Sequence, residues 1–157
     1  MASVKPFTAS AELSANIQRV LVDLIDLSTV GKQAHWNILG ENFRDLHLNL
    51  DEMVEIAREA SDNFAERMRE LYATPDGRTA TVAKESSLPE FPEGEISTHD
   101  AIDAIVDSIY ATTNTMREVH DQVDAEDPTT SDILHNYIEK LEQQAWFIGA
   151  DNRKPKN

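Results

Sequence analysis

Apolar residues recur at spacings of three and four along two long stretches in the first half of the chain. That period places them on one face of an α-helix. The first predicted helix runs from about Ala9 to Asn37, and the second runs from about Phe43 to Tyr72. Gly40 and Asn42 break the pattern between them. The apolar positions of the two stretches are Leu13, Ile17, Val20, Leu21, Leu24, Leu27 and Val30, then Leu46, Leu50, Met53, Ala57, Phe64, Met68 and Leu71.

A long polar connection follows the second helix. Thr74 to Gly77 end that helix, and the stretch after them carries Pro89, Pro92 and Gly94. Proline and glycine interrupt regular structure, although a short helix has room to form at Thr79–Ser87. The connection is long enough to cross from one end of a helix bundle to the other.

Two more helical patterns complete the chain. The third helix is expected to begin at a Ser97 or Thr98 cap. The fourth is expected to have Asp127 as its cap and Pro128 at its first position, with Gly149 as its stop. Their apolar positions are Ile102, Ile105, Val106, Ile109, Ala111 or Thr112, Met116 and Val119, then Ile133, Leu134, Tyr137, Ile138, Leu141, Ala145 and Ile148. No strand pattern is visible, so we predict an all-α four-helix bundle with ferritin-like topology.

The length of 157 residues suffices for one domain with a hydrophobic core, and we expect tails at about residues 1–8 and 151–157. The chain has no cysteine and carries 29 acidic against 14 basic residues, a formal net charge of −15. Disulfide, zinc-finger and thiol chemistry are therefore excluded. The acidic excess disfavours a nucleic-acid surface and attracts cations. We see neither a signal peptide nor an apolar run that spans a membrane, so we expect a cytoplasmic protein.

Five nitrogen and oxygen ligands, His35, His47, Asp51, Asp62 and Glu66, form the candidate site. His47 and Asp51 are four residues apart, as are Asp62 and Glu66, so each pair lies on one helix face. Asp62 follows Asp51 by eleven residues, which places both pairs on the same face, roughly 16 Å apart. One metal ion cannot reach both pairs of one helix. An antiparallel second copy, related by a two-fold axis, would bring the first pair of one chain opposite the second pair of the other.

Spacing alone also allows a simpler interpretation of these residues. Charged residues form 27% of the chain, so carboxylates four apart are common, and His120 and Asp124 repeat the His-x-x-x-Asp spacing. A mixture of imidazole and carboxylate nevertheless suits redox-active Fe(II). A di-iron site inside one bundle uses Glu-x-x-His on two helices. The chain contains no Glu-x-x-His, the nearest approximation being Asp132 to His135, so an intersubunit site is expected instead.

The sequence from Lys32 to Asp51, KQAHWNILGENFRDLHLNLD, resembles the signature of the Dps family, whose name stands for DNA-binding protein from starved cells. The segment from Ala60 to Arg67, ASDNFAER, matches the second half of that signature. Trp146 to Ile148 resembles the fourth-helix ending of the family. The resemblance covers nearly the whole chain and implies a small ferritin assembled from twelve subunits.

The resemblance implies a ferroxidase centre that combines His35, His47 and Asp51 of one subunit with Asp62 and Glu66 of a two-fold mate. The two mate residues would hold the tighter of two iron positions. His35 would come from the first helix, and His47 and Asp51 would complete that position or bridge to the second, weaker one. Family members oxidise Fe(II), generally with hydrogen peroxide, and store the ferric mineral inside a hollow dodecamer. Consuming both reactants prevents hydroxyl radical formation.

Two neighbours of the ligands carry alternative roles. Trp36 is either an electron donor that quenches stray oxidising equivalents or a packing aromatic at a helix end. Lys32 is either a partner of the ligands or a plain surface lysine. His99, His120 and His135 are interpreted as structural or surface residues, with His120 available for opportunistic metal binding.

The resemblance also implies three-fold pores near the start of the fourth helix. The best matches for their lining are Asp127 and Asp132, followed by Asp124. A ring of carboxylates would focus cations into such a pore. The alternative interpretation is a solvated cap and an acidic loop, which also contains Asp121 and Glu126.

Two rival functions stay open at this point. Metals between subunits acting as Lewis acids on water would give a hydrolase. The other rival is a DNA-compacting structural protein. Family members that condense DNA use lysine-rich tails, whereas this N-terminus offers only Lys5 and the C-terminal cluster Arg153, Lys154 and Lys156 is short. We therefore expect no direct DNA binding.

Overall fold

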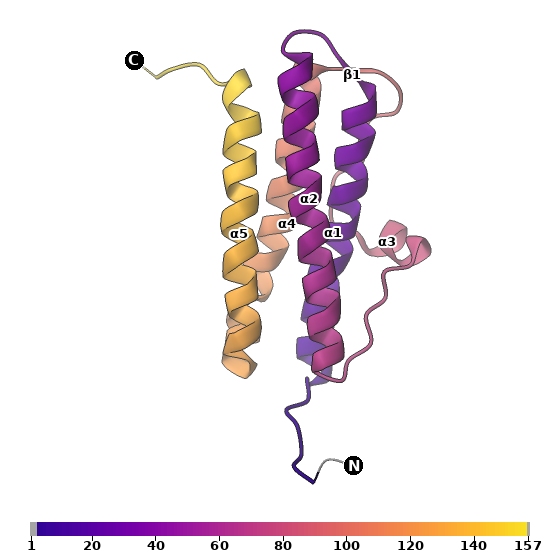
Figure 1. Ribbon diagram of the computed structural model, residues 1–157, viewed down its shortest axis with the longest axis vertical. Helices are drawn as coiled ribbons and strands as arrows, with labels where there is room; N and C mark the ends of the chain where they lie inside the picture. Colours follow the sequence, from indigo (N-terminus) through magenta and orange to yellow (C-terminus); the bar gives the residue numbers. More distant parts are fainter. Residues whose placement is uncertain (1–2, 157) are drawn as a thin grey trace.

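The computed structural model describes residues 3–156, in which four long helices stand side by side (Figure 1). From the N-terminus, α1 rises, α2 and α4 descend, and α5 rises again (Figure 1). The connection between α2 and α4 runs the length of the bundle, with the short α3 outside it against α1. This arrangement confirms the predicted all-α bundle and its long crossover. The elements are α1 (Ala11–Asn37), β1 (Ile38–Leu39), α2 (Phe43–Glu70), α3 (Thr79–Glu85), β2 (Ile96–Ser97), α4 (Thr98–Glu126), α5 (Pro128–Gly149) and the 3-10 turn η1 (Ala150–Asn152).

Local caps set the helix boundaries. The Oγ of Ser97 accepts a hydrogen bond from the backbone N–H of Asp100, at 3.0 Å, so α4 begins where its cap was expected. Ser10 caps α1 in the same way, and the helix therefore starts two residues later than predicted. The end of α2 falls at Glu70, two residues early, because Tyr72 adopts a φ of 61°, in the left-handed region that ends helices.

Two short strands contradict the expectation that the chain contains none. β1, at the end of α1, pairs in parallel with β2, which leads into α4, and Ile38 lies opposite Ile96 in the register. Two residues are too few to show the alternating pattern that identifies a strand in a sequence. The pairing holds the α1–α2 turn against the start of α4, and both isoleucines are buried.

The crossover is fastened to the bundle by a buried carboxylate. Asp23 on α1 is 1% exposed, and it accepts hydrogen bonds from the backbone N–H of Ser87, at 2.9 Å, and from the Oγ of Ser87. The Oγ1 of Thr115 on α4 donates to it as well, at 2.7 Å. Next to this contact, Ser86 donates to Asp26 at 2.5 Å. Because both serines turn toward α1, α3 ends at Glu85 rather than at Ser87.

The predicted apolar positions form one core between the four long helices. Thr112, rather than Ala111, faces this core, and its hydroxyl donates to the carbonyl of Ser108 at 3.0 Å. The two largest fully buried side chains are Phe64 and Tyr137, whose ring centroids lie 6.0 Å apart. The core therefore holds α2 and α5 together near the second carboxylate pair of α2.

A side-chain amide holds the C-terminal end of the bundle. Asn152 belongs to η1, and its side-chain amide donates to the carbonyl of His99 and to Asp103, each at 2.8 Å, so the C-terminal tail begins at Arg153. The outermost tail positions, 1–2 and 157, fall outside the described residues. Within residues 3–156, no helix combines the length and the apolar character needed to cross a membrane.

Candidate metal centre

The end of α1 and the start of α2 bring two predicted ligands, His35 and His47, face to face. Their imidazole rings stack with centroids 3.6 Å apart and planes 19° from parallel. The Nδ1 atom of His35 lies 2.8 Å from the carbonyl oxygen of His47, and the Nδ1 atom of His47 lies 3.0 Å from the carbonyl oxygen of His35. The two contacts are reciprocal, so each residue fixes the ring orientation of the other.

These contacts determine which ring nitrogen is free. A carbonyl oxygen only accepts hydrogen bonds, so each Nδ1 must carry the proton and donate it. Nε2 of both neutral rings then keeps its lone pair, which is the form that binds a metal. A metal-ligating histidine typically donates its other N–H to a carbonyl or carboxylate in this way. Nε2 is therefore the ring nitrogen of His35 and of His47 that is left available to a metal.

Asp51 stands beside the imidazoles and is held by Lys32. The Nζ atom of Lys32 lies 2.6 Å from Oδ1 of Asp51, and Nδ1 of His35 lies 3.3 Å from the same oxygen. The hydrogen bond from Lys32 is the main reason why the pKa of Asp51 is below its ordinary value, and it outweighs the opposing effect of slight burial. Lys32 therefore forms an ion pair with the candidate ligand Asp51 and is not a plain surface lysine.

Asp62 and Glu66 lie farther along α2 and are exposed. Within residues 3–156, no group of three or more His, Asp or Glu side chains lies close enough together to hold a metal ion. In one chain His35 stacks on His47 and lies 3.3 Å from Asp51, but these three side chains do not form a complete metal-binding group, and Asp62 and Glu66 are not part of their cluster. An open hollow of about 620 Å³ lies between Asp51 and Asp62, and it is lined by Lys32, Asp51, Val54, Glu55, Arg58, Glu59 and Asp62.

Two aromatic residues accompany the imidazoles. Phe43 stacks on His47 with ring centroids 5.1 Å apart, a contact that the sequence analysis did not identify. The spacing of four residues on one helix was the available signal. Trp36 follows His35 directly but is 69% exposed, so it does not pack within its own chain.

The three candidate pore residues differ in their surroundings. Asp132 and Asp124 are both exposed, and Asp124 also accepts a hydrogen bond from the Oγ of Ser131 at 2.5 Å. Asp127 is only 7% exposed and occupies the N-cap position of α5, as predicted. Its Oδ2 accepts from Nη2 of Arg67, at 2.9 Å, and from the Oγ1 of Thr130, at 2.5 Å. Asp127 is thus engaged inside the chain, whereas Asp124 and Asp132 are both exposed.

The Arg67–Asp127 ion pair is expected to stabilise the fold by an amount that depends on pH. Burial alone would raise the pKa of Asp127, but hydrogen bonds from Thr130 and Arg67 outweigh it and hold the pKa below the ordinary value. Arg67→Met should lower the free energy of unfolding by about 2 kcal/mol at neutral pH, because it leaves a buried carboxylate without its cation. The stabilisation is present above the unfolded pKa of about 4 and is lost as the pH falls through the folded pKa.

Urea unfolding at one protein concentration, from about pH 7 down to about pH 3, measures this effect. The difference between the wild type and Arg67→Met should shrink below about pH 4. Arg78→Met is the matched control, since Arg78 also pairs with an aspartate, Asp76, but is highly exposed. A difference that stays constant down to the lowest pH would contradict the assigned role of Asp127.

The chain is similar to known proteins over most of its length. The sequence matches the ferritin-like domain family over residues 14–154. A DNA protection during starvation protein of Agrobacterium fabrum is 32% identical over 146 residues, which cover 92% of this chain and 90% of that protein. Among solved structures, Dps from Microbacterium arborescens in the high iron form has a TM-score of 0.85 at 32% identity, covering 93% of this chain and 98% of that one. Dps92 from Deinococcus radiodurans also has a TM-score of 0.85, at 29% identity, covering 88% of this chain and 84% of that one.

The bundle, its crossover and the domain match define a ferritin-like protein. The relatives narrow this class further, because they carry the Dps name and align over most of both chains. The chain belongs to the Dps family.

Proposed function

We propose that the protein is a ferroxidase and an iron-storage protein whose iron sites are shared between two chains. In the reaction, two Fe(II) ions each give one electron to hydrogen peroxide, whose O–O bond breaks to give two hydroxide ions. The ferric product is retained as mineral inside a hollow dodecamer. Consuming Fe(II) and peroxide together protects the cell from hydroxyl radicals.

The observation that carries this proposal is the orientation of the His35 and His47 rings by hydrogen bonds at Nδ1. Both present a free Nε2 lone pair because their Nδ1 protons are given to backbone carbonyls. The adjacent Asp51 adds an anionic oxygen, which Lys32 holds in place. Imidazole together with carboxylate and open positions is a donor set that suits Fe(II).

The second half of each site would come from another chain. Asp62 and Glu66 share the exposed side of α2 with Asp51, and the hollow beside them is open. A two-fold axis across this side of α2 would place them opposite His47 and Asp51 of the mate. Each dimer would then contain two identical sites, each completed by the exposed carboxylates of the mate.

The relatives add support for iron and for protection. One solved relative is described in a high iron form, and the curated relative from Agrobacterium fabrum is named for DNA protection. We propose that protection here results from removal of Fe(II) and peroxide rather than from DNA binding. A net charge of −15 repels the phosphate backbone, so a gel-shift assay at physiological salt should show no complex.

Iron loading followed by native mass spectrometry and metal analysis tests the proposed function. Anaerobic protein given Fe(II) and then peroxide should oxidise the iron rapidly, more slowly with oxygen alone, and retain it in a dodecameric shell. The retained iron should far exceed two ions per chain, which only a mineral core explains. Ferric iron that precipitates outside the protein would contradict storage. Amide or ester turnover that is lost on chelation would indicate a hydrolase instead.

A further inference from the structure

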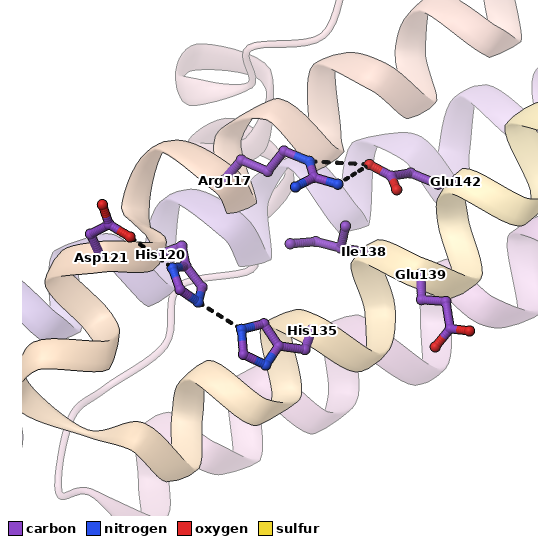
Figure 2. Close-up of a pocket in the computed structure, with 7 residues that line it drawn as sticks. All are labelled: Arg117, His120, Asp121, His135, Ile138, Glu139 and Glu142. Carbon is purple, nitrogen blue, oxygen red and sulfur yellow. Dashed lines mark hydrogen bonds and ion pairs between the residues drawn. The ribbon is translucent and has the colours of Figure 1, made fainter.

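Two further imidazoles meet at the surface between α4 and α5, away from the candidate metal centre. The Nε2 atom of His120 lies 2.7 Å from the Nε2 atom of His135, and the ring centroids are 4.8 Å apart (Figure 2). The pair borders a hollow of about 730 Å³, which is also lined by Arg117, Asp121, Ile138, Glu139 and Glu142 (Figure 2).

The other nitrogen of each ring faces a carboxylate. Nδ1 of His120 lies 2.9 Å from Oδ1 of Asp121, and Nδ1 of His135 lies 3.6 Å from Oδ1 of Asp132. A carboxylate attracts the ring proton to Nδ1, by a hydrogen bond in the first case and by charge in the second. Where both ring protons lie on Nδ1, the two Nε2 atoms carry lone pairs that repel each other at 2.7 Å; with the other tautomer of one ring, one Nε2 donates its proton to the other. In either case the two Nε2 atoms face each other, so a single cation, either a proton or a metal ion, can contact both of them.

Divalent transition metals fit this position chemically. Imidazole is a ligand for zinc, copper, iron and nickel, and a carboxylate behind each imidazole raises its basicity. Two nitrogens at about 2.0–2.1 Å from a tetrahedral zinc ion are about 3.3 Å apart, so the rings would need to separate by about 0.6 Å. His120 is half-buried and the side chain of His135 is 56% exposed, so the surrounding packing allows this small movement.

The charges around the pair favour a cation as well. Among the described residues that line the hollow, Arg117 is the positively charged one, and its Nη2 lies 2.5 Å from Oε1 of Glu142. Its charge is therefore already neutralised. Asp121, Asp132 and Glu139 remain as anions near the imidazoles. Their combined field raises the local concentration of cations.

We propose that His120 and His135 form a second cation site, which binds a divalent transition metal ion through both Nε2 atoms with water in the remaining positions. The site lies on α4 and α5 and uses none of the ligands of α1 and α2, so it does not depend on the ferroxidase proposal. From the sequence, His120 alone was available for opportunistic metal binding. The structure adds the second imidazole and the carboxylates behind the pair.

Equilibrium dialysis of the assembled protein against a fixed free concentration of Zn²⁺ tests the proposal. His120→Gln and His135→Gln should each lower the bound zinc by about one ion per chain, because one imidazole alone binds weakly. The matched control is His99→Gln. His99 is exposed, as His135 is, and lies beside an aspartate, Asp100, but no second imidazole lies next to it within residues 3–156, so this variant should retain the full zinc content. Zinc held at the α1–α2 centre is common to all variants and cancels in the comparison.

A measurement on the wild-type protein removes any dependence on how the variants fold. Crystals soaked in Zn²⁺ should show an anomalous peak bonded to both Nε2 atoms. Absence of that peak, or equal zinc uptake by the pair variants and the His99→Gln control, would overturn the proposal. The cation between the two rings would then be a proton only.

Discussion

Asp62→Asn combined with Glu66→Gln is expected to reduce the initial rate of Fe(II) oxidation by about 100-fold or more and to leave the assembly intact. Loss of an outer partner of a metal ligand already costs about 10–100-fold, and this variant removes two proposed ligands from every site. Both side chains are exposed on α2, and the amides keep their size, so packing is unchanged. Stopped-flow absorbance of ferric species after mixing with peroxide gives the rate, and native mass gives the assembly.

A matched variant separates ligand loss from a general effect of charge. Glu90→Gln with Glu93→Gln also removes two negative charges, but from exposed positions on the crossover, away from α2. This control should oxidise Fe(II) at nearly the wild-type rate, because long-range attraction of cations is shared among many carboxylates. An unchanged rate in the Asp62→Asn, Glu66→Gln variant, with its assembly verified, would show that these residues do not hold the reacting iron.

Much of the fold could be predicted because its signals are local. Ser97 caps α4 and Pro128 begins α5 at the positions expected from the sequence, since capping depends on a few adjacent residues. The faces of the long helices were also predictable from the period of their apolar residues. By contrast, the pairing of Ile38 with Ile96 joins segments distant in the chain and is too short to leave a pattern.

The candidate site shows the same division between local and distant signals. The spacing of His47, Asp51, Asp62 and Glu66 fixed their common side of α2, because helical geometry repeats every 3.6 residues. The exchange of hydrogen bonds between His35 and His47 was not predictable, because it depends on the turn that folds α2 back against α1. Nothing in the spacing of residues reports ring orientation or the position of a proton.

The surroundings of isolated charged residues were the hardest to foresee. Asp127 has the residue type and the sequence position expected of a pore carboxylate. Its charge is nevertheless neutralised by Arg67, sixty residues away in the sequence. His120 and His135 come from different helices, and only the packing of α4 on α5 brings their Nε2 atoms together. In each case the decisive partner is distant in sequence, so a search along the chain finds one member and misses the pair.

Mixing two inactive variants is expected to restore about one quarter of the wild-type Fe(II) oxidation rate. One variant carries His47→Ala and Asp51→Ala, and the other carries Asp62→Ala and Glu66→Ala. In a two-fold dimer of one chain of each kind, one of the two sites receives both intact halves and the other receives both damaged halves. Random pairing makes half of all dimers mixed, so about a quarter of all sites is complete.

The recovered fraction distinguishes shared sites from sites within one chain. Co-expression with two different affinity tags, followed by tandem purification, isolates shells that contain both variants, and native mass gives the ratio of the two chains. If every ligand of a site came from one chain, each chain in the mixture would still lack part of its site and the rate would stay at the level of the separate variants. Recovery that follows the product of the two chain fractions, with a maximum at equal amounts, requires that one iron site draws its ligands from two chains, since only the mixed dimer contains an intact site.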